Sequence, residues 1–225
     1  MTPYEAEMIG RLHTENEDGL ARFETLVLAQ QPATVPWKSV TDYSFEARKE
    51  IEGKHPELIW HHLIWCDDAD VLDYGCGSNA TLVRLLEEYR DNHQRHSQVR
   101  IRGYDPASNP ATEQSVKPPI KPIWDLVICR EVLEHCTIRQ IRQVVAELCD
   151  FSAHLVYVTT RFHLAPQHLL DVMTSDALDP THISMLNQTL LRVLFVLEGF
   201  KRRADLEKRM DWQHKGRVLV YERAA

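Results

Sequence analysis

Several features are scarce in this sequence of 225 residues. It has only 8 glycines and 5 cysteines, and its 26 basic residues are outnumbered by 33 acidic ones. No stretch of about 18 consecutive apolar residues occurs, which argues against a membrane span. The formal net charge of −7 argues against broad attraction to nucleic acid or to an anionic membrane. The cysteines are odd in number and form no CxxC pair, which is typical of a reduced chain without a disulfide framework or a structural zinc site.

The composition, with 44% hydrophobic and 26% charged residues, is that of an ordinary globular protein. The N-terminus carries acidic residues where a signal peptide has a basic and then an apolar segment, so we expect a cytoplasmic protein. One basic cluster goes against the overall charge, and we expect it to be a solvated strand edge or helix face. It consists of Lys201, Arg202, Arg203, Lys208 and Arg209.

The most informative segment is Asp70 to Leu82, DVLDYGCGSNATL. Its apolar start predicts a buried strand, Gly75 and Gly77 break that strand, and the apolar spacing that follows predicts a helix. A strand, a glycine turn and a helix N-terminus present backbone N–H groups to a ligand that approaches closely. Because there is no third glycine at the GxGxxG spacing, we expect a nucleoside-type cofactor and not a dinucleotide.

The remainder of the chain alternates between predicted strands and helices. This alternation, followed by a final pair of strands, predicts an α/β three-layer sandwich with a mostly parallel sheet. We expect residues 1–66 to form N-terminal helices or a lid, and residues 67–225 to form the cofactor-binding domain. The proline-rich stretch 106–123 has room for at most one short strand. Further strands are expected at 99–105, 124–129, 155–160, 200–206 and 217–222, with helices at 81–93, 138–148 and 186–195.

Asp105 ends the strand expected at 99–105 and is followed by Pro106. In open α/β sheets the ligand lies beyond the carboxyl ends of the strands, near the point where the strand order reverses. An acid in that position can accept hydrogen bonds from both hydroxyls of a ribose. An Asp before a proline is also a common turn former, but the neighbouring glycine loop favours the ribose.

A second candidate site follows the strand expected at 124–129. Glu131, Glu134 and His135 are spaced i, i+3 and i+4, so a helix would place all three on one side. Two carboxylates and an imidazole could bind a hard divalent ion, or act as a general base and its orienting partner. Alternatively, they are structural, with a carboxylate that caps a loop and an imidazole in the pocket wall. His182 is a candidate fourth member of this group.

Four segments in this order resemble the motifs of the Rossmann-like, or class I, S-adenosylmethionine-dependent methyltransferases. VLDYGCGSN is similar to the glycine-rich first motif, YDP to the acidic second motif, and WDLVICREVLEH to the motif of the fourth strand. DPTHISMLNQTLLRVLFVLEGF is similar to a late segment of a small-molecule subgroup with an EVLEH motif. The resemblance covers roughly residues 68–222 and implies a seven-stranded, mostly parallel sheet whose last strand is antiparallel.

The resemblance also implies site residues. Asp105 would hold the ribose, and Arg130 would lie beside the cofactor just past the fourth strand. Catalysis would fall to Glu131, Glu134, His135 and His182. The methionine end of the cofactor would be lined by Asp73, Gly75, Cys76 and Gly77.

The expected function is transfer of a methyl group to a hydroxyl, or less favourably an amine, of a small metabolite, as in a natural-product or sugar pathway. One alternative is a metal-dependent 2′-O-methyltransferase that acts on an RNA 3′ end, because such enzymes hold a divalent ion with a similar ExxEH. Other relatives with these letters need no metal, so the metal stays an open question. A non-catalytic partner protein with the cofactor fold is the third alternative.

Overall fold

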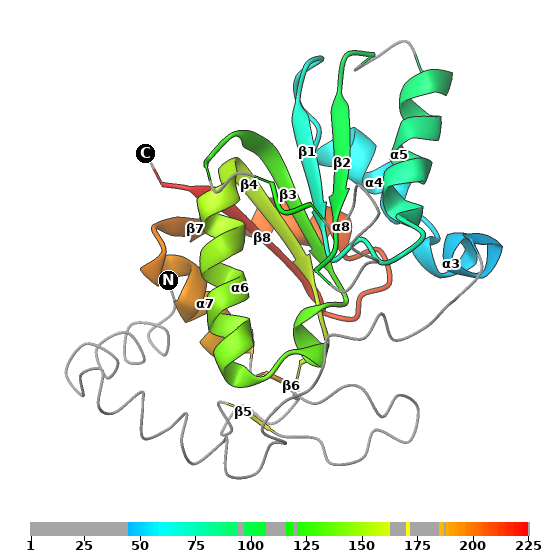
Figure 1. Cartoon of the computed structure of the whole chain (residues 1–225). Helices are drawn as coiled ribbons and strands as arrows, with labels where there is room; N and C mark the ends of the chain where they lie inside the picture. The colour runs from blue at the N-terminus through cyan, green and yellow to red at the C-terminus, as the bar shows by residue number, and fades with distance from the viewer. Residues whose placement is uncertain are drawn as a thin grey trace.

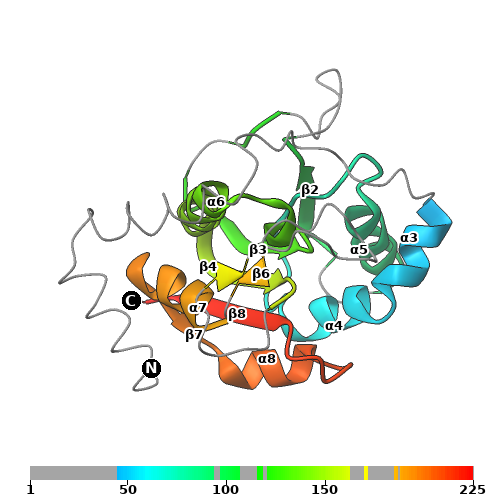
Figure 2. The same cartoon turned by 90° about the horizontal axis from the view of Figure 1, so that it is seen from below.

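The computed structural model describes residues 45–93, 97–106, 116–118, 121–162, 170–171, 185–186 and 188–224. A six-stranded sheet lies between two layers of helices, with the strand order β2-β1-β3-β4-β8-β7 (Figures 1 and 2). The strands are β1 (Asp70–Tyr74), β2 (Arg100–Tyr104), β3 (Trp124–Arg130), β4 (Ser152–Thr159), β7 (Phe200–Arg202) and β8 (Val218–Arg223).

Strands β1 to β4 are parallel, and β8 runs antiparallel to both β4 and β7. The sheet is therefore mostly parallel with an antiparallel last strand, as expected. The expected count of seven strands is not found, because the described residues give this sheet six. The missing strand would fall within 106–123, whose described part forms none; Pro118 and Pro122 there have no N–H group for a strand ladder. A separate ribbon pairs β5 (Leu170–Asp171) with β6 (Met185–Leu186).

Helices cover both faces of the sheet because alternate strand residues point to opposite faces. One face packs against α4 (His55–His62), α5 (Thr81–Asn92) and α8 (Ala204–Met210), and the other against α6 (Ile138–Phe151) and α7 (Gln188–Leu197). Along β1, for example, Val71 belongs to the first core and Leu72 to the second. Helix α3 (Phe45–Glu52) lies against α5, and a single 3₁₀ turn, η2 (Leu133–His135), follows β3.

The described part of the N-terminal segment contributes to the core. In and just after α4, the side chains of Ile59, Trp60, Leu63 and Ile64 are at most 2% exposed. They pack with residues of β1, β3 and α5 in one cluster. Residues 1–44 lie outside the described residues, so a lid formed by residues 1–66 stays a prediction.

The strand expected at 200–206 is shorter than expected. Strand β7 ends at Arg202, and α8 begins at Ala204 with the acidic residues Asp205 and Glu207 in its first turn. Acidic side chains at that end of a helix interact favourably with its unpaired N–H groups. A run of only seven residues is too short for helical and strand spacing to be told apart from sequence.

The basic cluster lies on β7 and α8, as a strand edge and a helix face. Its charges are largely paired: Lys201 with Glu222, Arg202 with Glu207, and Arg203 with Asp205. The cluster therefore offers little net charge to an anionic polymer. Among the residues that the structure describes, no helix is both long and apolar enough to cross a bilayer.

Candidate active site

The glycine loop after β1 lies where the strand order reverses, because β2 pairs with one edge of β1 and β3 with the other. Gly75 and Gly77 have φ angles of +80° and +69°, a region that side chains with a Cβ rarely occupy. The N–H groups of Gly75 and Cys76 both donate to the carbonyl of Tyr104, at 2.7 and 3.3 Å. These bonds join the end of β1 to the end of β2.

Two acids border this loop. Asp105 accepts a 2.7 Å hydrogen bond from the N–H of Gly77, and Asp73 at the end of β1 is only 3% exposed. Burial and the nearby charge of Asp105 raise the pKa of Asp73 to about 7, although Arg48 acts to lower it. The loop is therefore bordered by two carboxyl groups, whose oxygens can accept hydrogen bonds from the amino or hydroxyl groups of a ligand.

Space around the loop is unevenly distributed. A methyl group at Gly75 would lie 2.4 Å from Cγ2 of Val132, whereas one at Gly77 would meet nothing within 4 Å. Cys76 turns its sulfur toward Gly103, where a Cβ would lie 2.7 Å from that atom. The backbone of Gly77 is thus open to a ligand, and the buried acids suit a ligand with cationic groups and hydroxyls.

Helix α3 closes one side of this site. The guanidinium of Arg84 on α5 stacks on the ring of Phe45, 3.6 Å from the ring centroid. One turn further along α3, Arg48 is near enough for its charge to act on both Asp73 and Arg130.

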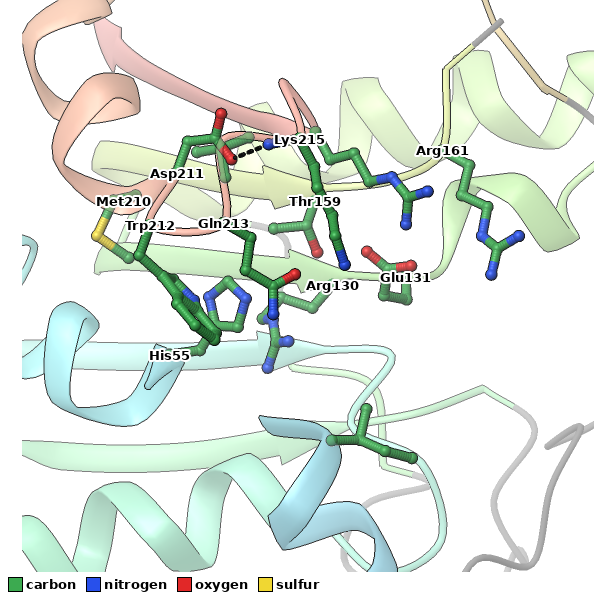
Figure 3. Close-up of a pocket in the computed structure, with 13 residues that line it drawn as sticks. His55, Arg130, Glu131, Thr159, Arg161, Met210, Asp211, Trp212, Gln213 and Lys215 are labelled. Atoms are coloured by element: carbon green, nitrogen blue, oxygen red, sulfur yellow. Dashed lines mark hydrogen bonds between the residues drawn. The ribbon is translucent and has the colours of Figure 1, made fainter. Parts of the chain in front are cut away.

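A pocket of about 270 Å³ opens next to the loop, at the carboxyl ends of β3 and β4 (Figure 3). Its other wall is the segment between α8 and β8. Trp212 and His55 lie at one end of the pocket, and Glu131 and Arg161 lie at the other (Figure 3). The lining residues are Ile51, His55, Arg130, Glu131, Thr159, Arg161, Met210, Asp211, Trp212, Gln213, Lys215, Arg217 and Val218.

Arg130, the last residue of β3, lies in this pocket wall and pairs with the carboxylate of Glu52 from α3. The two side chains are 9% and 11% exposed, so each charge relies on the other for compensation. Burial lowers the pKa of Arg130 despite the nearby Glu131. The pair fixes the end of β3 to α3.

The segment after β3 does not form a helix, although the prediction that Glu131, Glu134 and His135 lie on one side assumed one. Glu131 has a φ of +51°, and its N–H donates to the carbonyl of Thr159 at 2.8 Å. Only residues 133–135 turn, as η2, and they turn in a 3₁₀ conformation. This hydrogen bond to β4 holds the backbone of Glu131 in the left-handed region. The side chain of Glu131 points into the pocket, whereas residues 133–135 form a separate turn.

Glu134 lies behind Glu131 and is fully buried, where it accepts a 2.8 Å hydrogen bond from the hydroxyl of Thr160. Burial, together with the charge of Glu131, raises the pKa of Glu134 well above its usual value. Burial also acts to raise the pKa of Glu131, but the adjacent Glu134 and the cations Arg130 and Arg217 lower it overall. The pair thus holds one ionised carboxylate in the pocket over a neutral carboxyl behind it.

His135 is half-buried and does not line the pocket, and His182 lies outside the described residues. Within the part of the chain that the structure describes, no three His, Cys, Asp or Glu side chains are grouped so that they could hold a metal ion. The proposed use of Glu131, Glu134, His135 and His182 as metal ligands stays a prediction.

His55, the first residue of α4, is a pocket residue that sequence patterns did not identify. Its Nδ1 lies 2.9 Å from the hydroxyl of the buried Tyr157, and its ring packs edge-on to Trp212 with centroids 6.3 Å apart. Burial lowers the pKa of His55, against the opposing charges of Glu131 and Asp211, so the imidazole is neutral at pH 7. A single His at the start of a helix belongs to no sequence motif. The only feature of the sequence that could have indicated this pocket is Trp212, an aromatic residue in a short charged loop.

A mostly parallel sheet, a glycine turn after its first strand and an acid after its second define a Rossmann-like enzyme with a nucleoside cofactor. The chain belongs to the methyltransferase domain family, whose model matches residues 39–204. The predicted class, a methyltransferase that uses S-adenosylmethionine, is thereby confirmed. The finer EVLEH subgroup is not established by this match.

Solved structures show the same fold at low identity. A chain in the complex of the Haloferax volcanii methyltransferase activator Trm112 with a methyltransferase is 14% identical, with a TM-score of 0.51; the match covers 78% of this chain and 92% of that one. Phosphoethanolamine N-methyltransferase 2 of Haemonchus contortus is 9% identical, with a TM-score of 0.51 and coverage of 87% and 62%. No curated protein matches the sequence.

Proposed function

We propose that this methyltransferase transfers the methyl group of S-adenosylmethionine to a hydroxyl of a small metabolite, with an amine as the second choice. The observation that carries this proposal is the position of the 270 Å³ pocket beside the glycine loop. Val132 lies so close to Gly75 of the loop that a Cβ there would be 2.4 Å from its Cγ2, and Glu131, the residue before Val132, lines the pocket. A donor at the loop and an acceptor in the pocket would therefore be neighbours, and alignment of two reactants supplies much of the acceleration of such a displacement.

The cofactor is assigned to the residues around the glycine loop. The ionised form of Asp73 complements the cationic amino and sulfonium groups, and Asp105 accepts hydrogen bonds from the ribose hydroxyls. Gly75, Cys76 and Gly77 provide backbone surface for the cofactor to pack against, because their N–H groups already donate to Tyr104 and Asp105 and the side chain of Cys76 is turned toward Gly103. Arg130 lies next to this site, and its ion pair with Glu52 attaches the end of β3 to α3.

When bound, S-adenosylmethionine supplies a methyl group on a sulfonium, and the sulfur keeps the electron pair of the broken S–CH₃ bond. The acceptor oxygen forms the new O–CH₃ bond and gives up its proton to a base of the pocket. Glu131 is an ionised carboxylate there, and His55 is a neutral imidazole whose Nδ1 is engaged by Tyr157. Either group can take the proton, and Glu134 with Thr160 positions Glu131 from behind.

A small acceptor is favoured over an RNA end by the pocket and the charge. A pocket of about 270 Å³ is at the small end of the range for small-molecule sites, near 300 Å³. The net charge of −7 offers little to a phosphate backbone, and three cations of the basic cluster, Lys201, Arg202 and Arg203, are already paired with acids. His135 and His182 keep their predicted roles under the metal-dependent alternative.

The test incubates the full chain with methyl-labelled S-adenosylmethionine and a cell extract that has been separated into small-molecule and RNA fractions. We expect the label in small molecules, in a form stable to alkali as ethers are, and lost with a Glu131→Gln, His55→Gln double variant. Label recovered in the RNA fraction would favour the RNA alternative. Failure of the folded chain to bind S-adenosylhomocysteine in calorimetry would overturn the proposal.

A further inference from the structure

The pocket beside the glycine loop contains more positive than negative charge. Its lining includes the cations Arg130, Arg161, Lys215 and Arg217, but only two acids. Three of these six charged groups already have other partners. Arg130 is paired with Glu52, Arg161 also has a partner, and the carboxylate of Asp211 accepts the backbone N–H groups of residues 215 and 216.

Two cations, Lys215 and Arg217, then share the pocket with one carboxylate, Glu131. Arg217 acts on Glu131, since its charge helps to lower the pKa of that carboxyl. Among the described residues, the side chains of Lys215 and Arg217 form no ion pair, and Arg217 is half-buried. A half-buried guanidinium without a paired acid is a strong donor site for a planar anion.

The opposite end of the pocket is aromatic. The ring of Trp212 lies over the turn at Gly53, 3.4 Å from where a Cβ would stand there, and Lys54 lies 5.9 Å from its centroid. His55 meets the same ring edge-on (Figure 3). Trp212 thus places a large aromatic side chain in this wall of the pocket, against which a planar ligand can pack.

We propose that the acceptor is a small aromatic acid, whose carboxylate or phosphate is bound by Arg217 and Lys215 while its ring lies against Trp212. This inference rests on the proposed function, because it assigns the pocket to the acceptor. The same cations could instead hold the carboxylate of the cofactor. The two possibilities, an acceptor anion and the cofactor carboxylate, can be told apart. Binding of S-adenosylhomocysteine depends on the cations only if they hold the cofactor.

The test uses the full chain and begins with calorimetry of S-adenosylhomocysteine. With that compound saturating, benzoate, phenyl phosphate and the neutral benzamide are titrated. We expect at least one anion to bind about tenfold more tightly than benzamide, as a charge-assisted pair of bonds to arginine implies. The Lys215→Gln, Arg217→Gln variant loses this preference and keeps its affinity for S-adenosylhomocysteine. The control, Lys208→Gln with Arg209→Gln on the exposed side of α8, keeps both.

Several results would overturn this inference and leave the proposed function intact. They are equal binding of anions and benzamide, no binding of any of them, or a preference that survives in the pocket variant. If the pocket variant instead loses about tenfold or more in affinity for S-adenosylhomocysteine, the cations hold the cofactor, and the inference is wrong. If the wild-type chain does not bind S-adenosylhomocysteine, it is the proposed function that fails.

Discussion

The backbone N–H of Gly77 donates a 2.7 Å hydrogen bond to Oδ2 of Asp105. This bond joins the glycine loop after β1 to the acid after β2, so the two predicted cofactor motifs form one unit. A carboxylate has two oxygens and about four lone-pair positions. One oxygen can thus hold the loop while the carboxylate keeps capacity for a ribose.

Replacing Asp105 tests this arrangement. Asp105→Ala leaves the ribose hydroxyls unpaired and releases Gly77, so we expect the affinity for S-adenosylhomocysteine to fall by about 1–3 kcal/mol, roughly 5- to 150-fold. Isothermal calorimetry measures the change. Asp91→Ala removes an exposed acid from α5 and serves as the control. Equal affinity in the Asp105 variant would place the ribose elsewhere.

A pair of glycine variants separates backbone strain from ligand contact. Gly77 and Gly199 have φ angles of +69° and +81°, and a Cβ added at either position would meet no atom within 4 Å. Alanine at either position costs about 1–2 kcal/mol of folding free energy, since both prefer the left-handed region. Only Gly77→Ala should also weaken binding of S-adenosylhomocysteine, because the added methyl group at Gly77 would occupy space assigned to the cofactor, whereas Gly199 is not part of the proposed site. Thermal unfolding and calorimetry measure the two effects, and equal binding losses in both variants would argue against that placement.

The two halves of the site differ in how far local sequence patterns reveal which residues lie together. Asp73, Gly75, Gly77 and Asp105 lie at the ends of adjacent parallel strands, so local patterns were enough to bring them together. His55 and Arg217 meet in the pocket from segments far apart in the chain, and neither carries a pattern of its own.

Backbone conformation explains the other differences. The positive φ of Glu131 is imposed by the pairing of its N–H with Thr159 on the next strand, a tertiary contact that residue spacing does not reveal. The helix considered at 131–135 depended on residue spacing alone, and tertiary context outweighed that spacing.

The burial of Asp73 predicts a pH dependence. Its folded pKa of about 7 lies above the ordinary value of 3.8, so the folded state binds the extra proton and stability falls as pH rises between these values. The shift corresponds to at most about 4 kcal/mol. Asp73→Asn removes the penalty, and we expect it to raise the melting temperature more at about pH 8 than near pH 4, while it weakens S-adenosylhomocysteine binding. An equal shift at both pH values would show that folding does not raise the pKa of Asp73.

The neutral state of His55 can be observed directly. Burial lowers its pKa below 6.5, and Glu131 opposes this change. In proton NMR, with the signal assigned by its loss in His55→Gln, we expect the ring to titrate below 6.5, and lower still in Glu131→Gln. Because the unfolded chain binds the proton more readily, this group makes stability rise with pH up to about 6.5. A titration above 6.5 would contradict a neutral imidazole as the proposed proton acceptor.

The ion pair between Arg130 and Glu52 connects the sheet to α3, and its removal tests how strongly. Glu52→Ala leaves a buried guanidinium uncompensated, and breaking such a pair costs about 3–5 kcal/mol. Lys49→Ala removes the exposed pair between Lys49 and Glu88, whose side chains are about half exposed, and should cost under about 1 kcal/mol. Denaturant unfolding compares the two. In an Arg130→Met, Glu52→Leu double variant most of the loss should return, because no unpaired charge stays buried; a double variant as unstable as Glu52→Ala would mean that packing, and not charge compensation, holds α3 in place.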